Sequence, residues 1–287
     1  MRRIRTGPAA IKAPAKINLF LRVLGRRHDG YHNIETVFHV ISLCDEITLS
    51  PAKAVKFTSS GIPVPKGKGN LCVRAAELLR EYCGIKAGAR IRLLKRIPSG
   101  AGLGGGSSDA AACLLGLNRL WKTGLNRSAL LKLAARLGSD VPFFILGRAA
   151  LGRGRGELLT PLKSRLRGWV VVLKPRFGIS TADAYRALDR EERPPVARNA
   201  IKITVEAVRK GNLRNLSAYN DFESVAARMH PQIDDLILAL RGAGAVHSFM
   251  TGSGSALVGV FRTEAMAKSA ATRAGKDNKV KALVAKL

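Results

Sequence analysis

A glycine-rich stretch between a strand pattern and a helix pattern constrains the fold of this chain more than any other feature. Residues 98–109 read Pro-Ser-Gly-Ala-Gly-Leu-Gly-Gly-Gly-Ser-Ser-Asp. Residues 90–97 before it alternate partly as in a strand, and residues 110–115 after it are helix formers. Glycine lets the backbone approach a ligand closely, and the free N–H groups at a helix N-terminus favour an anion. We therefore expect this junction to bind a phosphate.

The known glycine-rich motifs do not all fit this stretch. A Walker loop requires a lysine after its last glycine, and none follows here. A dinucleotide site requires an acidic residue about 20 positions further on, and no Asp or Glu lies between Asp109 and Asp140. Flexible glycine linkers are rarely found between a strand and an alanine-rich helix. The stretch therefore predicts a nucleotide phosphate site of another kind.

The charge of the chain raises a second class of function. The formal net charge is +29, which is compatible with a basic RNA-binding module. Aromatic residues make up only 5% of the chain, and no basic stretch is rich in the aromatic side chains that stack on bases. We therefore expect anionic small-molecule substrates and no specific nucleic-acid partner.

Composition and length predict a globular cytoplasmic protein. With 287 residues, 46% of them hydrophobic, the chain is long enough for one large or two smaller domains with buried cores. No apolar run approaches the roughly 20 residues of a membrane span, and residues 1–12 lack the apolar core of a signal peptide. The cysteines lack C-x-x-C spacing and have apolar neighbours, which predicts buried free thiols at Cys44, Cys72, Cys83 and Cys113.

Two polar residues near the N-terminus lie in a predicted strand over residues 12–24. Because Lys16 and Asn18 are two positions apart, they point to the same face and can address one ligand. An exposed lysine on an edge strand explains the same pattern. Tyr31 and His32 follow a turn signal at residues 28–30, and for His32 a purely structural role is equally compatible with the sequence.

Two further polar residues stand at predicted helix starts. Asn70 precedes a helix pattern that ends before Gly84, and Asp140 precedes an apolar segment that contains Pro142. Helix capping explains each of them without any ligand. Further helix patterns cover residues 127–137, 220–229 and 232–241, and the segment from residue 265 onward predicts a helix and a final strand. A domain boundary is expected near residue 160, where the chain becomes glycine-rich and basic before a new strand pattern begins at residue 169.

The order of several motifs resembles that of the GHMP kinases. Their three motifs match Pro14-Ala15-Lys16-Ile17-Asn18-Leu19, the stretch from Pro98 to Ala112, and Met250-Thr251-Gly252-Ser253-Gly254-Ser255-Ala256. The resemblance implies that the third motif folds against the glycine-rich stretch. Two further segments resemble the branch that phosphorylates the 2-hydroxyl of 4-diphosphocytidyl-2-C-methyl-D-erythritol in non-mevalonate isoprenoid synthesis. These segments are Asp29-Gly30-Tyr31-His32 and Gly138-Ser139-Asp140-Val141-Pro142-Phe143-Phe144.

The resemblance implies an ATP- and Mg²⁺-dependent kinase and assigns roles to residues. Lys16 and Asp140 become the catalytic pair, and Ser107 or Ser108 becomes a candidate Mg²⁺ ligand. The cytidine diphosphate substrate would contact Asn18, Tyr31, His32, Thr181 and Tyr185, although Tyr185 packing against Leu188 is an alternative. The ATP-binding set would be Asn70, Pro98, Ser99, Gly100, Ala101, Gly102, Leu103, Gly104, Gly105, Gly106, Ser107 and Ser108.

The implied fold is α+β with two domains. Residues 1–160 would form a nucleotide-binding domain like ribosomal protein S5, and residues 161–287 a ferredoxin-like α/β sandwich, with the site between them. A GHMP kinase acting on mevalonate, homoserine or a sugar stays an alternative at this point, as does the RNA-binding module. The sequence leaves monomer and homodimer open, and it does not divide the catalytic work between Lys16 and Asp140.

Overall fold

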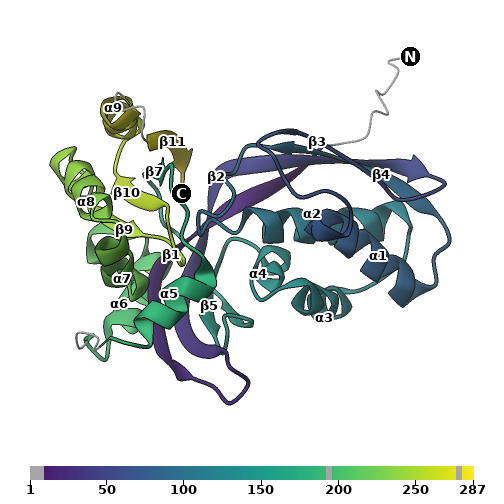
Figure 1. The fold of residues 1–287 in the computed structure, drawn as a ribbon, viewed down its shortest axis with the longest axis horizontal. Helices are drawn as coiled ribbons and strands as arrows, with labels where there is room; N and C mark the ends of the chain where they lie inside the picture. Colours follow the sequence, from purple (N-terminus) through teal and green to yellow (C-terminus); the bar gives the residue numbers. More distant parts are fainter. Residues whose placement is uncertain (1–9, 192–195, 276–279) are drawn as a thin grey trace. The chain divides into compact units, whose positions relative to one another are not determined.

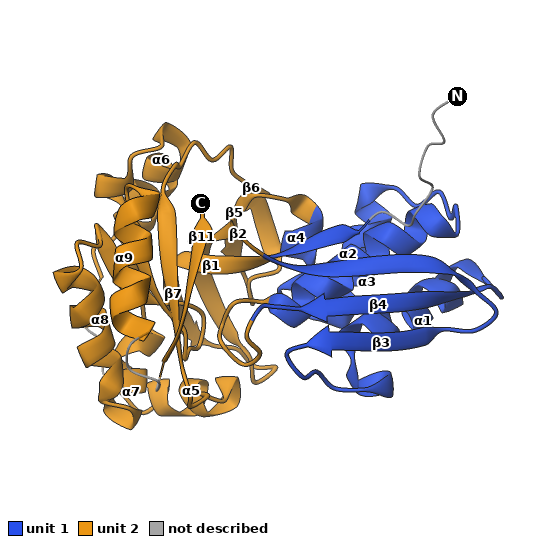
Figure 2. Cartoon of the chain, turned by 90° about the horizontal axis from the view of Figure 1, so that it is seen from above, with its two compact units in different colours: residues 1–14, 44–97, 105–145 blue, residues 15–43, 98–104, 146–287 orange. Residues whose placement is uncertain are grey.

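The chain forms two compact units, each built from several separate segments. The computed structural model describes residues 10–191, 196–275 and 280–287. Unit 1 comprises residues 1–14, 44–97 and 105–145, and unit 2 comprises residues 15–43, 98–104 and 146–287 (Figure 2). Two long strands, β1 (Ile11–Arg26) and β2 (His32–Ala52), run from one unit into the other. The predicted domain boundary near residue 160 stays a prediction.

Unit 1 consists of a sheet covered by helices (Figure 1). In the sheet, β4 pairs antiparallel with residues 46–52 of β2 and parallel with β3. The remaining elements of the unit are β3 (Lys56–Gly61), a 3-10 turn (Gly67–Gly69), α1 (Leu71–Cys83), β4 (Gly88–Lys95), α2 (Gly105–Leu120), α3 (Arg127–Leu137) and α4 (Val141–Leu146).

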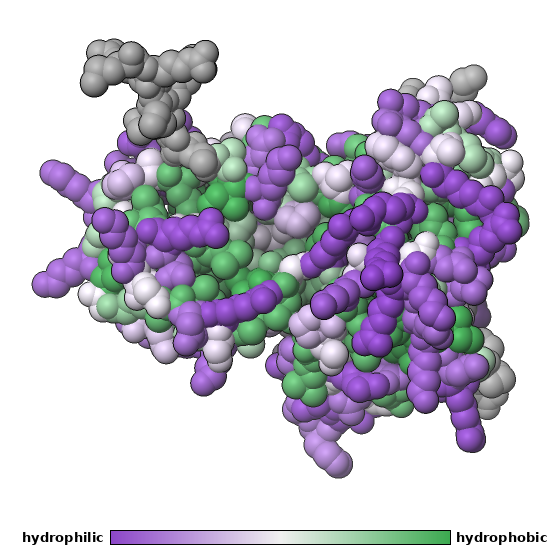
Figure 3. Space-filling model, turned by 180° about the vertical axis from the view of Figure 1, so that it is seen from behind, coloured by the Kyte–Doolittle hydropathy of each residue, from purple (hydrophilic) through white to green (hydrophobic). Residues whose placement is uncertain are grey.

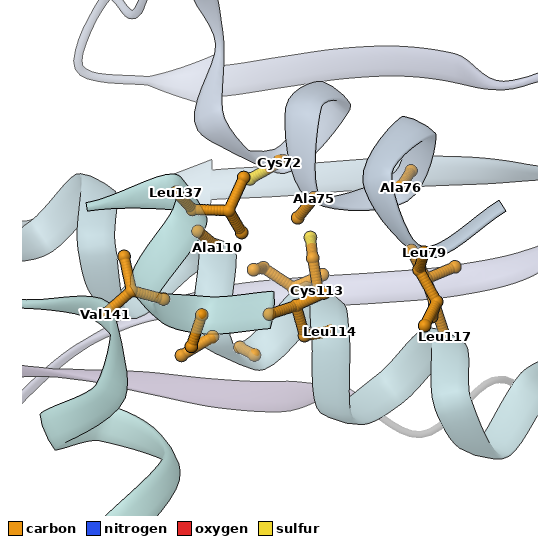
Figure 4. Close-up of a cluster of buried hydrophobic side chains, with 14 of the residues drawn as sticks. Cys72, Ala75, Ala76, Leu79, Ala110, Cys113, Leu114, Leu117, Leu137 and Val141 are labelled. Carbon is orange, nitrogen blue, oxygen red and sulfur yellow. The ribbon is translucent and has the colours of Figure 1, made fainter. Parts of the chain in front are cut away.

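Small side chains let the helices of unit 1 pack closely. Cys72 and Ala75 of α1 lie beside Cys113 and Leu114 of α2 in the buried core (Figure 4). The hydrogen bond that the Cys113 thiol donates to Cys72, together with burial, raises the pKa of Cys113, so this thiol stays protonated and unreactive. All four cysteines are free as predicted, but only Cys72 and Cys113 are buried, whereas the other two are partly exposed.

The helix boundaries predicted at Asn70 and Gly84 are present in unit 1. The Asn70 side chain accepts a hydrogen bond from the Cys72 N–H at 2.8 Å, which makes it the N-cap of α1. Gly84 ends the same helix with φ of 63°, a conformation that favours glycine. Helix α3 spans the predicted residues and is capped by the Asn126 side chain, which accepts from the Ala129 N–H at 2.9 Å.

Unit 2 contains a four-stranded antiparallel sheet in the order β11-β7-β10-β9, with α7, α8 and α9 packed on it (Figure 1). In the same unit, β5 pairs with β2 and β6, and β8 pairs with β1. The elements are β5 (Ala149–Arg153), β6 (Leu158–Pro161), β7 (Trp169–Pro175), α5 (Thr181–Leu188), α6 (Ala200–Lys210), a 3-10 turn (Leu213–Asn215), β8 (Tyr219–Asn220), α7 (Phe222–Met229), α8 (Gln232–Gly242), β9 (His247–Met250), β10 (Leu257–Phe261), α9 (Glu264–Gly275) and β11 (Val280–Lys286).

One predicted helix start is wrong in unit 2. The sequence pattern placed it at Asn220, but α7 begins at Phe222. Asn220 instead pairs with Leu21 of β1, and its side-chain oxygen accepts from the Phe222 N–H at 3.0 Å. A strand contact distant in sequence therefore overrides the helix propensity. The helix and final strand expected from residue 265 onward are present as α9 and β11.

Hydrophilic groups lie across the face shown in Figure 3, with hydrophobic patches between them. Among the described residues, no helix is both long and apolar enough to cross a bilayer.

His39 in β2 is expected to make the fold sensitive to acid. The ring is fully buried between the Val40 carbonyl, 2.7 Å from Nδ1, and the Ser164 hydroxyl, 2.8 Å from Nε2. Burial lowers the pKa of His39 from 6.5 to about 4, against the opposing effect of the Val40 carbonyl. Between these pH values the unfolded chain binds a proton that the folded chain does not. The free energy of unfolding should therefore fall by about 3 kcal/mol as the pH drops from 6.5 to 4.

Urea unfolding of wild type and His39→Gln at pH 7 and pH 4.5 measures this effect. The variant should lose less stability on acidification than wild type does. His28→Gln serves as control because His28 is exposed, and it should keep the wild-type difference. An identical pH dependence in wild type and His39→Gln would show that His39 is not the responsible group.

Candidate active site

The glycine-rich loop follows a path that side chains would block. Gly100, Gly102 and Gly104 have φ of 60°, 71° and 67°, which favour glycine. A Cβ on Gly102 would lie 2.1 Å from the Thr251 carbonyl oxygen, and one on Gly252 would lie 2.9 Å from the Cα of Gly102. The third motif therefore lies directly against the loop, as the resemblance implies.

Two backbone hydrogen bonds connect the three motifs within unit 2. The Lys16 N–H donates to the Leu103 carbonyl at 2.9 Å, and the Ala256 N–H donates to the Ala101 carbonyl at 3.4 Å. The residues predicted to bind ATP are divided between the units. Unit 2 holds Pro98, Ser99, Gly100, Ala101, Gly102, Leu103 and Gly104, and unit 1 holds Asn70, Gly105, Gly106, Ser107 and Ser108.

The start of α2 has buried polar atoms without partners. Ser108 is 1% exposed, and its Oγ accepts and donates no hydrogen bond within the described residues. Asp109 Oδ1 is also buried and forms no hydrogen bond within the described residues. A Cβ on Gly105 would lie 2.9 Å from the Ile97 side chain and from Lys95 Nζ, so only glycine fits there. An unpartnered hydroxyl in the first turn of a helix suits a phosphate oxygen or a cation bound to it.

Nothing else in the described residues supplies a ready metal site. They contain no group of three or more His, Cys, Asp or Glu side chains able to hold an ion. A Mg²⁺ ion fits the start of α2 only if it takes most of its oxygen ligands from nucleotide phosphates and water, as Mg²⁺ commonly does. Of the two predicted serines, Ser108 has the buried unpartnered hydroxyl.

A buried ionic cluster next to this helix start was missed by sequence reasoning. Lys95 Nζ, at the end of β4, lies 2.6 Å from Asp45 Oδ2 and 2.6 Å from Asp109 Oδ2. Asp45 also accepts the backbone N–H groups of Arg96 at 2.6 Å and Ile97 at 2.9 Å. The cluster therefore fixes both the segment that leads into the glycine-rich loop and the helix that follows it.

The cluster holds one cation for two carboxylates. Burial and the nearby Asp45 raise the pKa of Asp109, although Lys95 opposes the shift. Burial by itself lowers the pKa of Lys95, but Asp109 and Asp45 more than offset this, so Lys95 stays protonated. The raised pKa of Asp109 therefore favours binding of a proton there, which would relieve the excess negative charge.

Lys16 and Asn18 lie together as their spacing predicts. They are 4% and 1% exposed, and Lys16 Nζ donates to Asn18 Oδ1 at 2.7 Å. The Asn18 amide donates to Thr36 Oγ1 at 2.7 Å, and the Asn18 N–H donates to Thr251 Oγ1 at 2.9 Å. The ammonium group is also 5.4 Å from the centre of the Phe38 ring. The alternative of an exposed edge lysine is wrong.

His32 and Tyr185, predicted to contact substrate, touch each other in unit 2. Their rings stack with centroids 4.4 Å apart, and Tyr185 meets Phe222 edge-on at 4.8 Å. His32 Nε2 lies 2.7 Å from Asp189 Oδ1. Asp189 was not predicted, because a contact across 157 positions leaves no local signal.

The other two predicted substrate residues are more exposed. Tyr31 is 55% exposed, with the Arg155 guanidinium 4.7 Å from the centre of its ring. Thr181 Oγ1 shares a hydrogen bond with Ser253 Oγ at 2.8 Å, which ties the start of α5 to the third motif.

Asn70 and Asp140 belong to unit 1. The capping role of Asn70 is confirmed, and its amide also donates to the Pro65 carbonyl at 2.9 Å. Contact of Asn70 with adenine stays a prediction. Asp140 is half-buried in the turn between α3 and α4. Because Lys16 lies in unit 2, its joint action with Asp140 also stays a prediction.

Two family models match the chain. Residues 70–148 match the GHMP kinases N terminal domain, and residues 204–279 match the GHMP kinases C terminal domain. A solved homoserine kinase from Cytophaga hutchinsonii is 18% identical, with a TM-score of 0.72 over 99% of this chain and 96% of that one. At this identity the likeness concerns the fold alone, and it confirms the predicted two-domain α+β class.

More similar proteins share a narrower description. The 4-diphosphocytidyl-2-C-methyl-D-erythritol kinase of Pelotomaculum thermopropionicum is 44% identical over 91% of this chain and 92% of its own length. That of Moorella thermoacetica is 43% identical over 92% and 93%. A solved 4-(cytidine 5'-diphospho)-2C-methyl-D-erythritol kinase is 38% identical, with a TM-score of 0.83 over 97% of this chain and 98% of that one. The chain therefore belongs to the GHMP kinases and, within them, to the 4-diphosphocytidyl-2-C-methyl-D-erythritol kinase family.

Proposed function

We infer that this chain transfers the γ-phosphoryl group of ATP to the 2-hydroxyl of 4-diphosphocytidyl-2-C-methyl-D-erythritol, a step of non-mevalonate isoprenoid synthesis. The observation that carries this inference is the 43–44% identity to kinases of this substrate over nine-tenths of both chains. The likeness to solved mevalonate and homoserine kinases, at 17–18% identity, supports only the shared fold.

The phosphate groups of ATP are proposed to bind at the glycine-rich loop and the start of α2. The backbone N–H groups from Gly102 to Ser108 would donate to the β- and γ-phosphates, and the absence of side chains lets the phosphates approach. The buried unpartnered hydroxyl of Ser108 supports its contact with a phosphate or with Mg²⁺. Mg²⁺, when bound, would supply charge neutralisation between the phosphates.

Phosphoryl transfer requires an acceptor oxygen that loses its proton as it attacks. The substrate oxygen forms a bond to the γ-phosphorus, the bond to the bridging oxygen breaks, and ADP leaves. Asp140 would orient the hydroxyl and accept its proton. Lys16 would stabilise the negative charge, and its hydrogen bond to Asn18 supports this role because it fixes the direction of the ammonium group.

The cytidine part of the substrate is proposed to bind beside His32 and Tyr185. Their stacked rings form an aromatic surface, and a pyrimidine base can add to such a stack. Thr181 and the exposed Tyr31 would complete the contacts. The hydrogen bond between Thr181 and Ser253 connects this region to the motif that lies against the glycine-rich loop.

The direct test is ATP- and Mg²⁺-dependent phosphorylation of the proposed substrate, followed by phosphorus NMR. We expect a new phosphomonoester signal, which should not form when mevalonate or homoserine replaces the substrate. A product with either of those alcohols instead would assign the chain to another GHMP activity. Failure to bind ATP, combined with salt-sensitive RNA binding, would favour the RNA-binding alternative.

A further inference from the structure

The His32 ring is held on two sides by one helix. Tyr185 lies in α5, and Asp189 follows one turn later, where its N–H donates to the Tyr185 carbonyl at 2.9 Å. Residues four positions apart lie on the same face of a helix, so both side chains reach His32. The Tyr185 ring stacks on the face of the imidazole, and Asp189 Oδ1 lies 2.7 Å from Nε2 at its edge.

The contact with Asp189 determines which ring nitrogen carries a proton. An ionised carboxylate only accepts hydrogen bonds, so Nε2 must carry the hydrogen that lies between His32 and Asp189. In the neutral ring the other nitrogen, Nδ1, is then an acceptor. By fixing the tautomer, Asp189 also determines whether His32 Nδ1 accepts a hydrogen bond from a ligand or donates one to it.

Nδ1 of His32 is available to a ligand. It makes no hydrogen bond to any described residue, although the side chain is only 6% exposed. Among all described residues, the fully buried side-chain polar atoms without a hydrogen-bond partner are Ser108 Oγ and Asp109 Oδ1, both far from His32 in the sequence. Nδ1 is not among them, so this atom is not completely sealed from solvent.

We propose that Asp189 is a positioning residue that keeps His32 Nδ1 an acceptor and thereby makes the base site prefer cytosine to uracil. Cytosine carries an amino group at position 4, which donates to such an acceptor, whereas uracil carries a carbonyl oxygen there. Two acceptors facing each other leave both without a partner, which disfavours uracil. The inference deepens the proposed function and rests on its assignment of the base site to His32.

Binding of a matched pair of ligands tests the preference. The pair is 4-diphosphocytidyl-2-C-methyl-D-erythritol and its uridine counterpart, measured by calorimetry without ATP, so that turnover is not required. Wild type should bind the cytidine compound about 10- to 100-fold more tightly than the uridine compound. This is the range expected when one ligand forms a hydrogen bond and the other leaves the same acceptor without a partner. In Asp189→Asn the new carboxamide can accept from Nε2 or donate to it, so this ratio should fall about tenfold.

Two further variants separate positioning from general effects. Asp189→Glu keeps a carboxylate and should retain most of the preference. Asp183→Asn makes the same change on the same helix, at a residue whose side chain is 45% exposed and paired with Arg186, and should leave the ratio unchanged. A ratio that stays constant in Asp189→Asn, even with both affinities reduced, would overturn the proposal.

Nitrogen NMR of wild type provides a test without any substitution at position 189. With labelled histidine, His32 should show a protonated Nε2 and an unprotonated Nδ1 near pH 8, identified by the signals lost in His32→Gln. A protonated Nδ1 would overturn the proposal. If base preference and tautomer are as expected but no phosphorylated product forms, the kinase assignment fails and the role of Asp189 stands.

Discussion

Asp140→Asn is expected to lower kcat by about 10²- to 10⁴-fold, the usual contribution of a positioned proton acceptor. The carboxamide has nearly the same shape as the carboxylate, but it cannot accept the proton of the substrate hydroxyl. Because Asp140 stands in a turn before α4 and the substitution removes no apolar contact, the fold should be retained. Steady-state kinetics with phosphorus NMR of the product measures the loss.

Substrate affinity distinguishes a chemical role from a binding role. Calorimetric titration of Asp140→Asn should give a dissociation constant for the cytidine substrate within a few-fold of wild type. Asp235→Asn, at an exposed position in the first turn of α8, serves as control and should keep full turnover. Unchanged turnover in Asp140→Asn would remove Asp140 from the mechanism, and a lost affinity with normal kcat would make it a substrate anchor only.

Local signals predicted much of the fold because the interactions behind them span few residues. The capping oxygen of Asn70, for example, reaches a backbone group only two positions away. The alternation of Lys16 and Asn18 likewise follows from strand geometry alone. The helix start at Asn220 was wrong because its strand partner, Leu21, lies about 200 positions earlier.

In the candidate site, too, local features were predicted and contacts between residues distant in sequence were not. Motif order predicted the loop and the motif that lies against it, since each motif is a short contiguous run. Asp45 and Asp189 were missed because each acts on a residue 50 or more positions away, Lys95 and His32 respectively. Such partners depend on which elements the fold brings together, and no spacing in the chain indicates them.

Lys95→Met is expected to destabilise the protein by about 3–5 kcal/mol, the cost of removing one partner from a buried ion pair. Nζ is the cation shared by Asp45 and Asp109, each 2.6 Å away, and all three side chains are at most 4% exposed. Without it, the two buried carboxylates lose their shared counter-charge, and only Asp45 keeps backbone N–H donors. Urea unfolding monitored by circular dichroism measures the change in the free energy of unfolding.

The loss should depend on pH in a defined direction. Burial already raises the pKa of Asp109 in the wild-type protein, so the folded state binds a proton there more tightly than the unfolded chain does. Removing the ammonium raises it further, and ionising Asp109 then costs more. A carboxyl with a raised folded-state pKa loses its contribution to stability as the pH rises. Lys95→Met should therefore be more destabilised at pH 8 than at pH 5.

A second substitution tests whether excess negative charge is the cause. Adding Asp109→Asn to Lys95→Met removes one of the two unpaired carboxylates while Asp45 keeps its two backbone donors, so about 1–2 kcal/mol should be recovered. Lys86→Met, at an exposed position of unit 1, should cost less than about 0.5 kcal/mol. A loss of stability in the double variant equal to the sum of the losses in Lys95→Met and Asp109→Asn alone would show that Lys95 acts through the packing of its side chain and not as the shared cation. Recovery in the double variant would instead show that this one charge holds the start of α2 against the strand that leads into the glycine-rich loop.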